Sequence, residues 1–459
     1  MVASERLRPC NRVPKDLGAF VVYWMQSYRR LACNHALNHA IEIANQRRLP
    51  LLILETLLPE EPWACDRFHS FVIQGTSGRR AESAAAGMGY VFFLPERAGE
   101  LWPRLDDLAR NVACIVTDDF PCQPIPGWIE RASRLEVPLI AVDSNGVLPL
   151  AAIPGEQYAA FSMRGRVDRL RMDHLQPMRR PPVRVAWPSN LNPHVEHCEV
   201  QTDHVSVLLQ RCDIDHDVVP VKLQGGETAA RRCLRRFIAQ RLVGYGERRN
   251  DPAVEATSGL SPYLHFGMIS ALEVALAVRG ATAPAADREA FLEQLIVRRE
   301  LSFNFTRYNP HYAITVGLPA WAARALATHR RDPRPHLYSL EELERAATGD
   351  VVWNLVQQEY VSHGEAHGYM RMLWGKSFLQ WTPSPEVALA RMIHLNNKYA
   401  LDGRDPNSYA GFAWCLGKHD RPFPGDRAIQ GVIRPMSSRA LAKRVNLDAY
   451  RQRVLGHQT

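Results

Sequence analysis

The chain has 459 residues, of which 46% are hydrophobic and 23% are charged, and its formal net charge is +8. This composition excludes an intrinsically disordered protein, and no apolar run is long enough to span a bilayer. The N-terminus is polar and lacks the apolar core of a signal peptide, so we expect a cytoplasmic monomer without a membrane partner. The basic balance favours polyanionic partners.

Apolar runs alternate with amphipathic stretches in the first third of the chain. The runs predict strands over residues 19–25, 49–55, 88–95, 112–120 and 137–143. The stretches between them predict helices over residues 31–46, 70–86 and 97–110. Strands that alternate with helices in this way indicate a doubly wound parallel sheet, although no GxGxxG fingerprint follows the first strand.

The character of the sequence changes after residue 162. Residues 163–185 are basic and contain several prolines, which is typical of a connector between domains. Beyond residue 228 helical patterns extend to the C-terminus. The predicted organisation is therefore an α/β domain over 1–162, a connector over 163–227 and an all-α domain over 228–459.

Basic side chains gather in two places. Each cluster fits either phosphate contacts or a solvated helix face, and the sequence leaves both interpretations open. The clusters consist of Arg231, Arg232, Arg235, Arg236, Arg241, Arg248 and Arg249, and of Arg434, Arg439, Lys443 and Arg444.

The cysteines and histidines argue against a metal centre. The nine cysteines are scattered, their number is odd, and no CxxC pair occurs, so we expect buried thiols outside any disulfide or cluster. His363 and His367 lie four residues apart on one predicted helix, but HGEAH is not the HExxH motif. We therefore predict no metal, and we expect His367 to pack or hydrogen-bond.

Two tryptophans stand out in the run VQQEYVSHGEAHGYMRMLWGKSFLQW, which has helical character. Trp374 and Trp381 are seven residues apart, so both indoles project from one side of a helix, roughly 10 Å apart along its axis. Such a pair fits either a packed seam or a relay for electrons, and a single buried tryptophan is more often part of a core.

Long stretches around these tryptophans resemble class II cyclobutane-pyrimidine-dimer photolyases. The matching words include WNLVQQE, HGYMRMLWGKSFLQWT, LNNKYALDGRDPNSYAGFAW, HDRPFPGDRAIQGVIRPM and SGLSPYLHFGMIS. The resemblance covers most of the chain and implies the photolyase/cryptochrome fold, in which an α/β antenna domain precedes a helical FAD-binding domain. It also implies light-driven repair of UV-damaged, double-stranded DNA with the dimer flipped out.

The resemblance assigns FAD contacts residue by residue. The phosphate-side candidates are Tyr245, Thr257, Ser258, Gly259, Leu260 and Ser261, and the ring-side candidates are Arg371, Asn396, Asp402 and Asp405. Ser261 before Pro262 independently predicts a helix start with serine as the N-cap. In the family, Asn396 would face the flavin N5, where an amide can donate or accept. For Asn396, Asp402 and Asp405 the alternative is turn chemistry.

The same resemblance implies an electron relay and a lesion pocket. The relay would run from Trp374, nearest the flavin, through Trp353 to Trp381 near the surface. Met372 and Trp414 would give the flipped dimer a flat apolar wall. The full set of implied lesion contacts is Arg249, Asn250, Gln294, Arg298, Met372 and Trp414.

Three departures from the family pattern keep alternatives open. Gln294, in FLEQL, stands where the family has a glutamate, and an amide cannot share a proton as a carboxylic acid can. The sequence after YWM is unusual, which leaves the 8-hydroxy-5-deazaflavin type of antenna open. The loop between Trp414 and His419 is one residue short. We predict a photolyase; the alternatives are a blue-light receptor, a flavoenzyme on another substrate, or a nucleic-acid-binding protein with a structural flavin.

Overall fold

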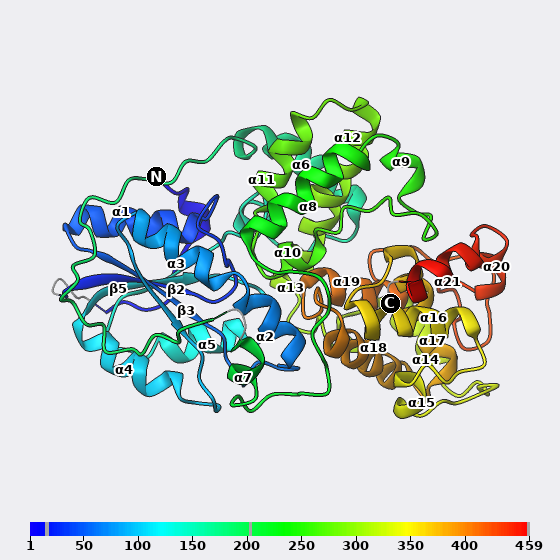
Figure 1. The fold of residues 1–459 in the computed structure, drawn as a ribbon. Helices are drawn as coiled ribbons and strands as arrows, with labels where there is room; N and C mark the ends of the chain where they lie inside the picture. Colours follow the sequence, from blue (N-terminus) through cyan, green and yellow to red (C-terminus); the bar gives the residue numbers. More distant parts are fainter. Residues whose placement is uncertain (14–17, 202–203, 457–459) are drawn as a thin grey trace. The chain divides into compact units, whose positions relative to one another are not determined.

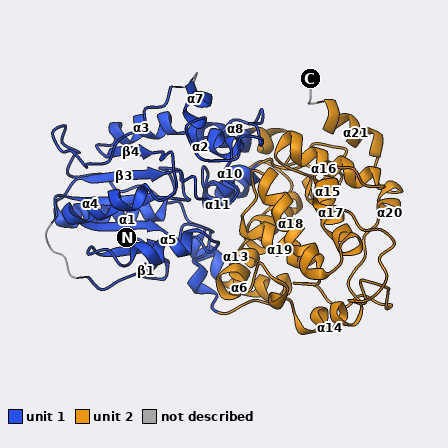
Figure 2. Cartoon of the chain, turned by 90° about the horizontal axis from the view of Figure 1, so that it is seen from below, with its two compact units in different colours: residues 1–154, 170–235, 260–280 blue, residues 155–169, 236–259, 281–459 orange. Residues whose placement is uncertain are grey.

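The computed structural model describes residues 1–13, 18–201 and 204–456 (Figure 1). It contains two compact units, shown in different colours in Figure 2. Unit 1 comprises residues 1–154, 170–235 and 260–280, and unit 2 comprises residues 155–169, 236–259 and 281–459. Each unit draws on separate stretches of chain, so the linear division at residues 162 and 227 stays a prediction. No helix in the described part of the chain is long and apolar enough to cross a membrane.

Unit 1 is built on a six-stranded sheet with the order β1-β6-β5-β2-β3-β4. Its strands are β1 (Leu7–Pro9), β2 (Phe20–Met25), β3 (Leu51–Thr56), β4 (Gly89–Phe93), β5 (Val112–Asp118) and β6 (Leu139–Val142). Strands β2 to β6 are parallel and confirm the five predicted runs, whereas β1 pairs antiparallel with β6 and was not predicted. Strand β1 has only three residues and ends in a proline, so its sequence shows no alternation of apolar and polar residues that would predict a strand.

Helices cover both faces of this sheet, with α1 and α3 on one side and α4 and α5 on the other (Figure 1). Their bounds are α1 (His35–Arg47), α2 (Asp66–Ile73), α3 (Thr76–Ala85), α4 (Leu101–Asn111) and α5 (Ile125–Ala132). The prediction of a single helix over 70–86 is wrong, because α2 ends before Gly75 and α3 begins after it. A Cβ atom there would lie 2.9 Å from the Cα of Gly226.

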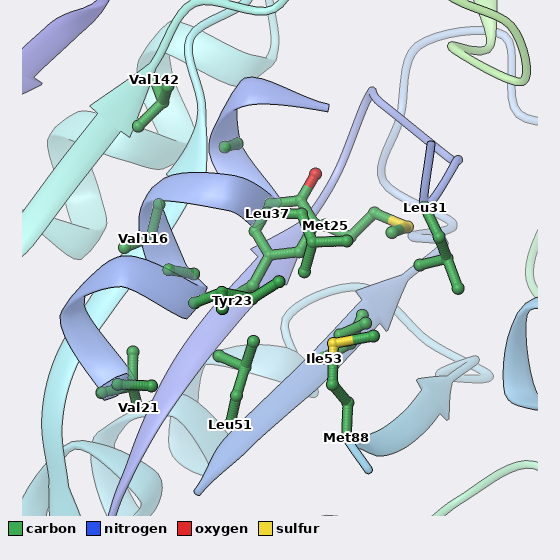
Figure 3. Close-up of a cluster of buried hydrophobic side chains, with 14 of the residues drawn as sticks. Val21, Tyr23, Met25, Leu31, Leu37, Leu51, Ile53, Met88, Val116 and Val142 are labelled. Atoms are coloured by element: carbon green, nitrogen blue, oxygen red, sulfur yellow. The ribbon is translucent and has the colours of Figure 1, made fainter. Parts of the chain in front are cut away.

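The core of unit 1 explains why the strands are continuous apolar runs. Val21, Tyr23 and Met25 point into a buried cluster with Leu37 of α1 and Ile53 of β3 (Figure 3). The alternate residue Trp24 faces the other way, where its ring meets that of Trp102 of α4, with centroids 6.3 Å apart. A strand that is buried on both faces is apolar at nearly every position, and the few buried polar groups of these strands have partners, as Glu55 of β3 has in Arg29 and Arg79.

The remaining elements of the described chain are helical. Unit 1 also contains α7 (Val205–Leu209), α10 (Ser261–His265) and α11 (Ala271–Arg279), while α6 (Ala160–His174) and α8 (Glu227–Gln240) run from one unit into the other. The first part of the predicted connector is therefore a helix.

Unit 2 is entirely helical over its described residues, which confirms the all-α prediction and the fold class. Its helices are α9 (Tyr245–Arg248), α12 (Ala285–Leu292), α13 (Arg299–Tyr308), α14 (Ala320–Thr328), α15 (Leu340–Glu344), α16 (Val351–His363), α17 (Gly368–Trp381), α18 (Pro385–Tyr399), α19 (Pro406–Cys415), α20 (Ser438–Ala442) and α21 (Leu447–Gly456). A π-helical segment, Glu293–Arg298, joins α12 to α13. Such segments occur often at functional sites.

The long helix predicted around the tryptophans is two helices. Gly364, with φ of 71°, ends α16 in the left-handed conformation that glycine adopts without strain. Consequently His363 and His367 do not share a helix, contrary to the prediction. Trp374 and Trp381 still share α17.

Candidate active site

Three indoles form a continuous contact chain in unit 2. Trp353 of α16 lies parallel to Trp374 of α17, with centroids 6.1 Å apart and planes at 7°. Trp353 also meets Trp381 edge-on at 5.4 Å. Trp353 and Trp374 have no exposed surface, whereas Trp381 is half-buried at the end of α17. Trp353 therefore bridges the two residues that the heptad spacing singled out.

Hydrogen bonds fix the two buried indoles. Trp353 donates its Nε1 hydrogen to the carbonyl oxygen of Trp374 at 3.0 Å. Trp374 donates to Oε1 of Gln357, which is fully buried one turn further along α16. Both acceptors are neutral, and the rings meet van der Waals partners on their other sides, including Phe378. This arrangement holds the rings in one geometry and permits an electron to pass between them.

A buried ion pair lies beside the inner end of this chain. Arg371 of α17 contacts both carboxylate oxygens of Asp402, at 3.0 and 3.2 Å. The guanidinium also lies 5.4 Å from the ring of Tyr360, whose ring in turn contacts Trp374 at 5.2 Å. Burial alone would lower the pKa of Arg371, but Asp402 raises it above its usual range, so the cation is permanent.

Asn396, near the end of α18, has a fixed orientation and one unused atom. Ser408 donates to the carbonyl oxygen of Asp402, so its Oγ accepts from Nδ2 of Asn396 at 3.2 Å. The second Nδ2 hydrogen goes to Oδ1 of Asn397. Oδ1 of Asn396 is buried with no hydrogen-bond partner in the protein. A buried acceptor in this state indicates a ligand with a donor at that point.

Comparison with known proteins decides the family. The chain is 38% identical to the deoxyribodipyrimidine photo-lyase of Methanothermobacter thermautotrophicus over 99% of both chains. It is 36% identical to that of Arabidopsis thaliana over 94% of this chain and 88% of the relative, and 32% identical to that of Potorous tridactylus over 96% and 82%. The chain belongs to the deoxyribodipyrimidine photo-lyase family. No protein-family model matches it.

Solved photolyases share the fold. A class III photolyase from Agrobacterium tumefaciens matches with a TM-score of 0.71 at 18% identity, over 96% of this chain and 87% of that one. An archaeal photolyase from Sulfolobus tokodaii matches with a TM-score of 0.64 at 16% identity, over 94% and 89%. At these identities the match concerns the architecture, and it confirms the predicted photolyase/cryptochrome fold.

FAD is the cofactor of the photo-lyase family, and the side chains in unit 2 fit its ring system. Nε of Arg371 is a buried donor without a partner, and Oδ1 of Asn396 is a buried acceptor without one. The flavin ring system carries acceptors on its carbonyl oxygens and ring nitrogens and donors at N3 and, when reduced, at N5, so it could satisfy both kinds of group. Arg371, as a fixed cation next to such a ring, would favour the reduced, anionic form. When bound, FAD supplies the light absorption and the electron.

Five of the six predicted phosphate-side residues are consecutive, at 257–261, and Tyr245 lies in α9. Gly259 has φ of +68°, which lets the backbone turn before α10. The N-cap of α10 is Leu260, and no side chain caps it, so the prediction that Ser261 is the N-cap is wrong by one residue. Tyr245 stacks edge-on against Phe237 and Phe291. Asp405 is the N-cap of α19, where its side chain accepts from the backbone N–H of Asn407, so it has a local structural role.

The structure brings some of the predicted lesion residues together. Gly411 leaves room for the Met372 side chain, whose Cε would lie 3.5 Å from a Cβ at that position. Trp414 lies three residues further along α19, with the ammonium of Lys376 4.6 Å from its ring. Arg249 directly follows α9, where its positive charge opposes the rise that burial causes in the pKa of Tyr245, and Asn250 is exposed next to it.

Gln294 and Arg298 belong to the π-helical segment. Glu293 pairs with both Arg164, at 2.7 Å, and Arg298, at 3.5 Å. Gln294 is half-buried, and its amide makes no hydrogen bond to a described residue. The carboxylate of Glu293 is therefore held by two arginines, whereas the amide of Gln294 can hydrogen-bond to a ligand.

Sequence reasoning missed three groups around the inner tryptophan. Gln357, Tyr360 and Ser408 orient Trp374 and Asn396, yet each is an ordinary polar residue in a helix and gives no sequence signal of its role.

In the two arginine clusters, Arg231 pairs with Glu227 and Glu273, and Arg434 pairs with Asp420. These members fit a solvated face better than a phosphate site.

The histidines have structural partners. His367 is the N-cap of α17, where Nδ1 accepts from the backbone of Tyr369, and Nε2 donates to the carbonyl oxygen of Arg249 at 3.1 Å. Burial lowers its pKa, consistent with a neutral ring. His363 donates to Val454. In the described ranges no group of three or more ligand-type side chains could hold a metal ion, and none of the nine cysteines is in a disulfide.

Proposed function

We propose that this chain is a class II-type photolyase that splits cyclobutane pyrimidine dimers flipped out of duplex DNA. The proposal rests on membership of the deoxyribodipyrimidine photo-lyase family. The joint geometry of the tryptophan relay (Trp374, Trp353 and Trp381) and the Arg371–Asp402 ion pair beside Asn396 supports the flavin side of it. A flavin held at Asn396 would take its electron from Trp374, and Trp353 and then Trp381 would refill the deficit on Trp374. A positive Arg371 would stabilise the reduced flavin.

In this proposal the lesion lies between the flavin and a wall made by Met372 and Trp414. The π-helical segment supplies Gln294, whose open amide would hydrogen-bond to a pyrimidine carbonyl. Arg249 and Arg298 would contact phosphates of the damaged strand. The proton-sharing role of the family glutamate is missing, so we expect repair per absorbed photon to be lower than with a carboxylic acid at this position.

A second function is favoured by one observation, the amide at Gln294. A pocket that offers a neutral donor and acceptor instead of a carboxyl group could serve a different ligand, which would make the protein a photoreceptor or a flavoenzyme with another substrate. The ordered relay is compatible with either function, because it recharges the flavin whatever the flavin then does.

A repair assay separates these functions. FAD-loaded, photoreduced protein would be mixed with a duplex that carries one cyclobutane thymine dimer and illuminated with blue or near-UV light, with dark and undamaged-duplex controls. Light-dependent recovery of intact thymines supports the proposal. Loss of recovery in Trp414→Ala, with normal flavin reduction, would support the assigned wall. Normal flavin reduction without any recovery would exclude dimer repair.

A further inference from the structure

The helix α6 begins with an aromatic side chain in solvent. Phe161 is 85% exposed, although it lies in the first turn of a helix whose Ala160, Met163 and Val167 are buried. One turn further on, Gly165 has no neighbour within 4 Å of the position of its absent Cβ atom, so nothing covers the ring from that side. A single exposed apolar side chain is ordinary on a protein surface, so the residues around the ring decide whether it marks a site.

Arginines surround this ring. A shallow groove of about 570 Å³ runs along α6 and is lined by Phe161, Ser162, Arg164, Gly165, Arg166, Asp168 and Arg169. Glu293 neutralises Arg164, and Arg166 and Arg169 against Asp168 still give the groove a net positive charge. Positive charge next to an exposed aromatic ring is the combination with which proteins hold nucleic acid, because cations contact phosphates and rings stack on bases.

Two contacts tie this helix to the elements of unit 2 that carry proposed lesion residues. Arg164 forms a two-pronged ion pair with Glu293, at 2.7 and 3.1 Å, directly before Gln294. Ahead of the helix, the carbonyl oxygen of Tyr158 accepts from His419, in the loop that follows Trp414. The exposed start of α6 is therefore held close to both the π-helical segment and the end of α19.

We infer that the Phe161 edge, defined as Phe161, Arg164, Gly165, Arg166 and Arg169, is a contact surface for the DNA duplex beside the lesion. The ring of Phe161 stacks on a base exposed by extrusion of the dimer, and Arg166 and Arg169 contact phosphates of the adjoining backbone. Arg164 fixes the helix through Glu293. The inference rests on the proposed function, since it requires damaged duplex DNA at the Gln294 pocket.

Binding in the dark tests this surface without the photochemistry. FAD-loaded wild type, Phe161→Ala, Phe161→Trp and Arg166→Gln would be titrated against a damaged duplex and an undamaged duplex over a range of salt concentrations. Met172→Ala is the matched control, because Met172 is 56% exposed on the same helix, about 16 Å further along its axis.

The two kinds of variant have different expected signatures. Phe161→Ala should bind the damaged duplex about tenfold more weakly without a change in the salt slope, and Phe161→Trp should restore binding. Arg166→Gln should reduce the slope by about 0.9, the contribution of one phosphate contact. Damaged duplex should quench the fluorescence of the indole added in Phe161→Trp, measured as the difference in tryptophan fluorescence between this variant and wild type.

Each other outcome overturns the inference. Equal affinities of wild type and Phe161→Ala, or the same loss on undamaged duplex, would exclude a stacking contact beside the lesion. If Phe161→Ala only abolished self-association, the ring would be a contact between copies. If the wild type showed no preference for damaged duplex, the proposed function would fall as well, whereas a preference of undiminished size in Phe161→Ala would remove only the Phe161 edge.

Discussion

Trp353 stacks on Trp374 with their planes 7° apart, and its edge meets Trp381, so one residue from α16 joins two residues of α17. Both inner rings are fully buried. Any electron path along these three indoles therefore has to pass through Trp353, and no other described indole contacts both partners.

We predict that Trp353→Phe abolishes most of the light-driven reduction of bound FAD. The phenyl ring fills most of the space but is far harder to oxidise than an indole. Oxidised Trp374 therefore cannot be refilled from this position, and the electron returns to it from the flavin. Flavin absorbance during continuous illumination with an external reductant measures the effect. Trp128→Phe, at a half-buried indole on α5 of unit 1, is the control and should behave as wild type.

The buried Arg371–Asp402 pair gives a prediction on stability. Asp402→Asn leaves the guanidinium of Arg371 charged and without its counter-ion in a buried place. Breaking such a pair by removing one partner costs about 3–5 kcal/mol. Thermal unfolding followed by circular dichroism, together with the FAD content after purification, measures the loss.

An exposed ion pair supplies the contrast. Arg330 and Glu386 lie 2.8 Å apart with about half of each side chain in solvent. Glu386→Gln should therefore change stability by about 1 kcal/mol or less. Equal effects of the two substitutions would contradict the assignment of Asp402 to a buried, flavin-side pair.

His419 predicts how stability depends on pH. Its Nδ1 hydrogen goes to Tyr158, and Nε2 is buried without a hydrogen-bond partner. Burial, with a contribution from Lys418, lowers the pKa of His419 from 6.5 to about 4. Because the folded pKa lies below the unfolded value, the unfolded state binds more protons between these limits, and stability falls as pH drops from 6.5 towards 4.

We predict that the free energy of unfolding falls less in His419→Asn than in wild type over this pH interval. The difference between the two decreases should be about 3 kcal/mol at most. Asparagine has no charge to gain, and it tolerates the left-handed backbone that His419 adopts, with φ of 58°. Denaturant unfolding at pH 7 and pH 4.5 gives the difference, which removes the contributions of the other histidines. Parallel pH profiles for the two proteins would contradict the buried, neutral state of His419.

The elements that sequence could predict are those whose signal is local. Buried parallel strands such as β2 are apolar throughout, so their positions followed directly from the composition of each run. The break at Gly364 interrupts an otherwise helical pattern and was missed, because only the backbone angle distinguishes an interior glycine from a C-cap.

The resemblance could name the members of the candidate site, but it could not give their geometry. The resemblance supplied Asn396, Arg371 and Asp402, whereas the direction of the Asn396 amide depends on Ser408, twelve residues away, and on the carbonyl oxygen of Asp402. Likewise, the contact between Trp353 and Trp374 depends on how α16 packs against α17, which side-chain periodicity does not specify.

The strongest test of how this chain departs from its family is at Gln294. Its amide can hydrogen-bond to the lesion but cannot share a proton, and the neighbouring Glu293 is held by Arg164 and Arg298. We predict that Gln294→Glu keeps dark binding of the damaged duplex and raises the number of dimers split per absorbed photon. Gln294→Leu should lose the hydrogen bond, which costs about 1 kcal/mol, or about fivefold in dissociation constant. Repair yields under matched illumination, with Glu293→Gln as the control for added or removed charge, measure both effects. A lower yield in Gln294→Glu would mean that the pocket has adapted to the amide and binds a ligand for which a carboxyl group is unfavourable.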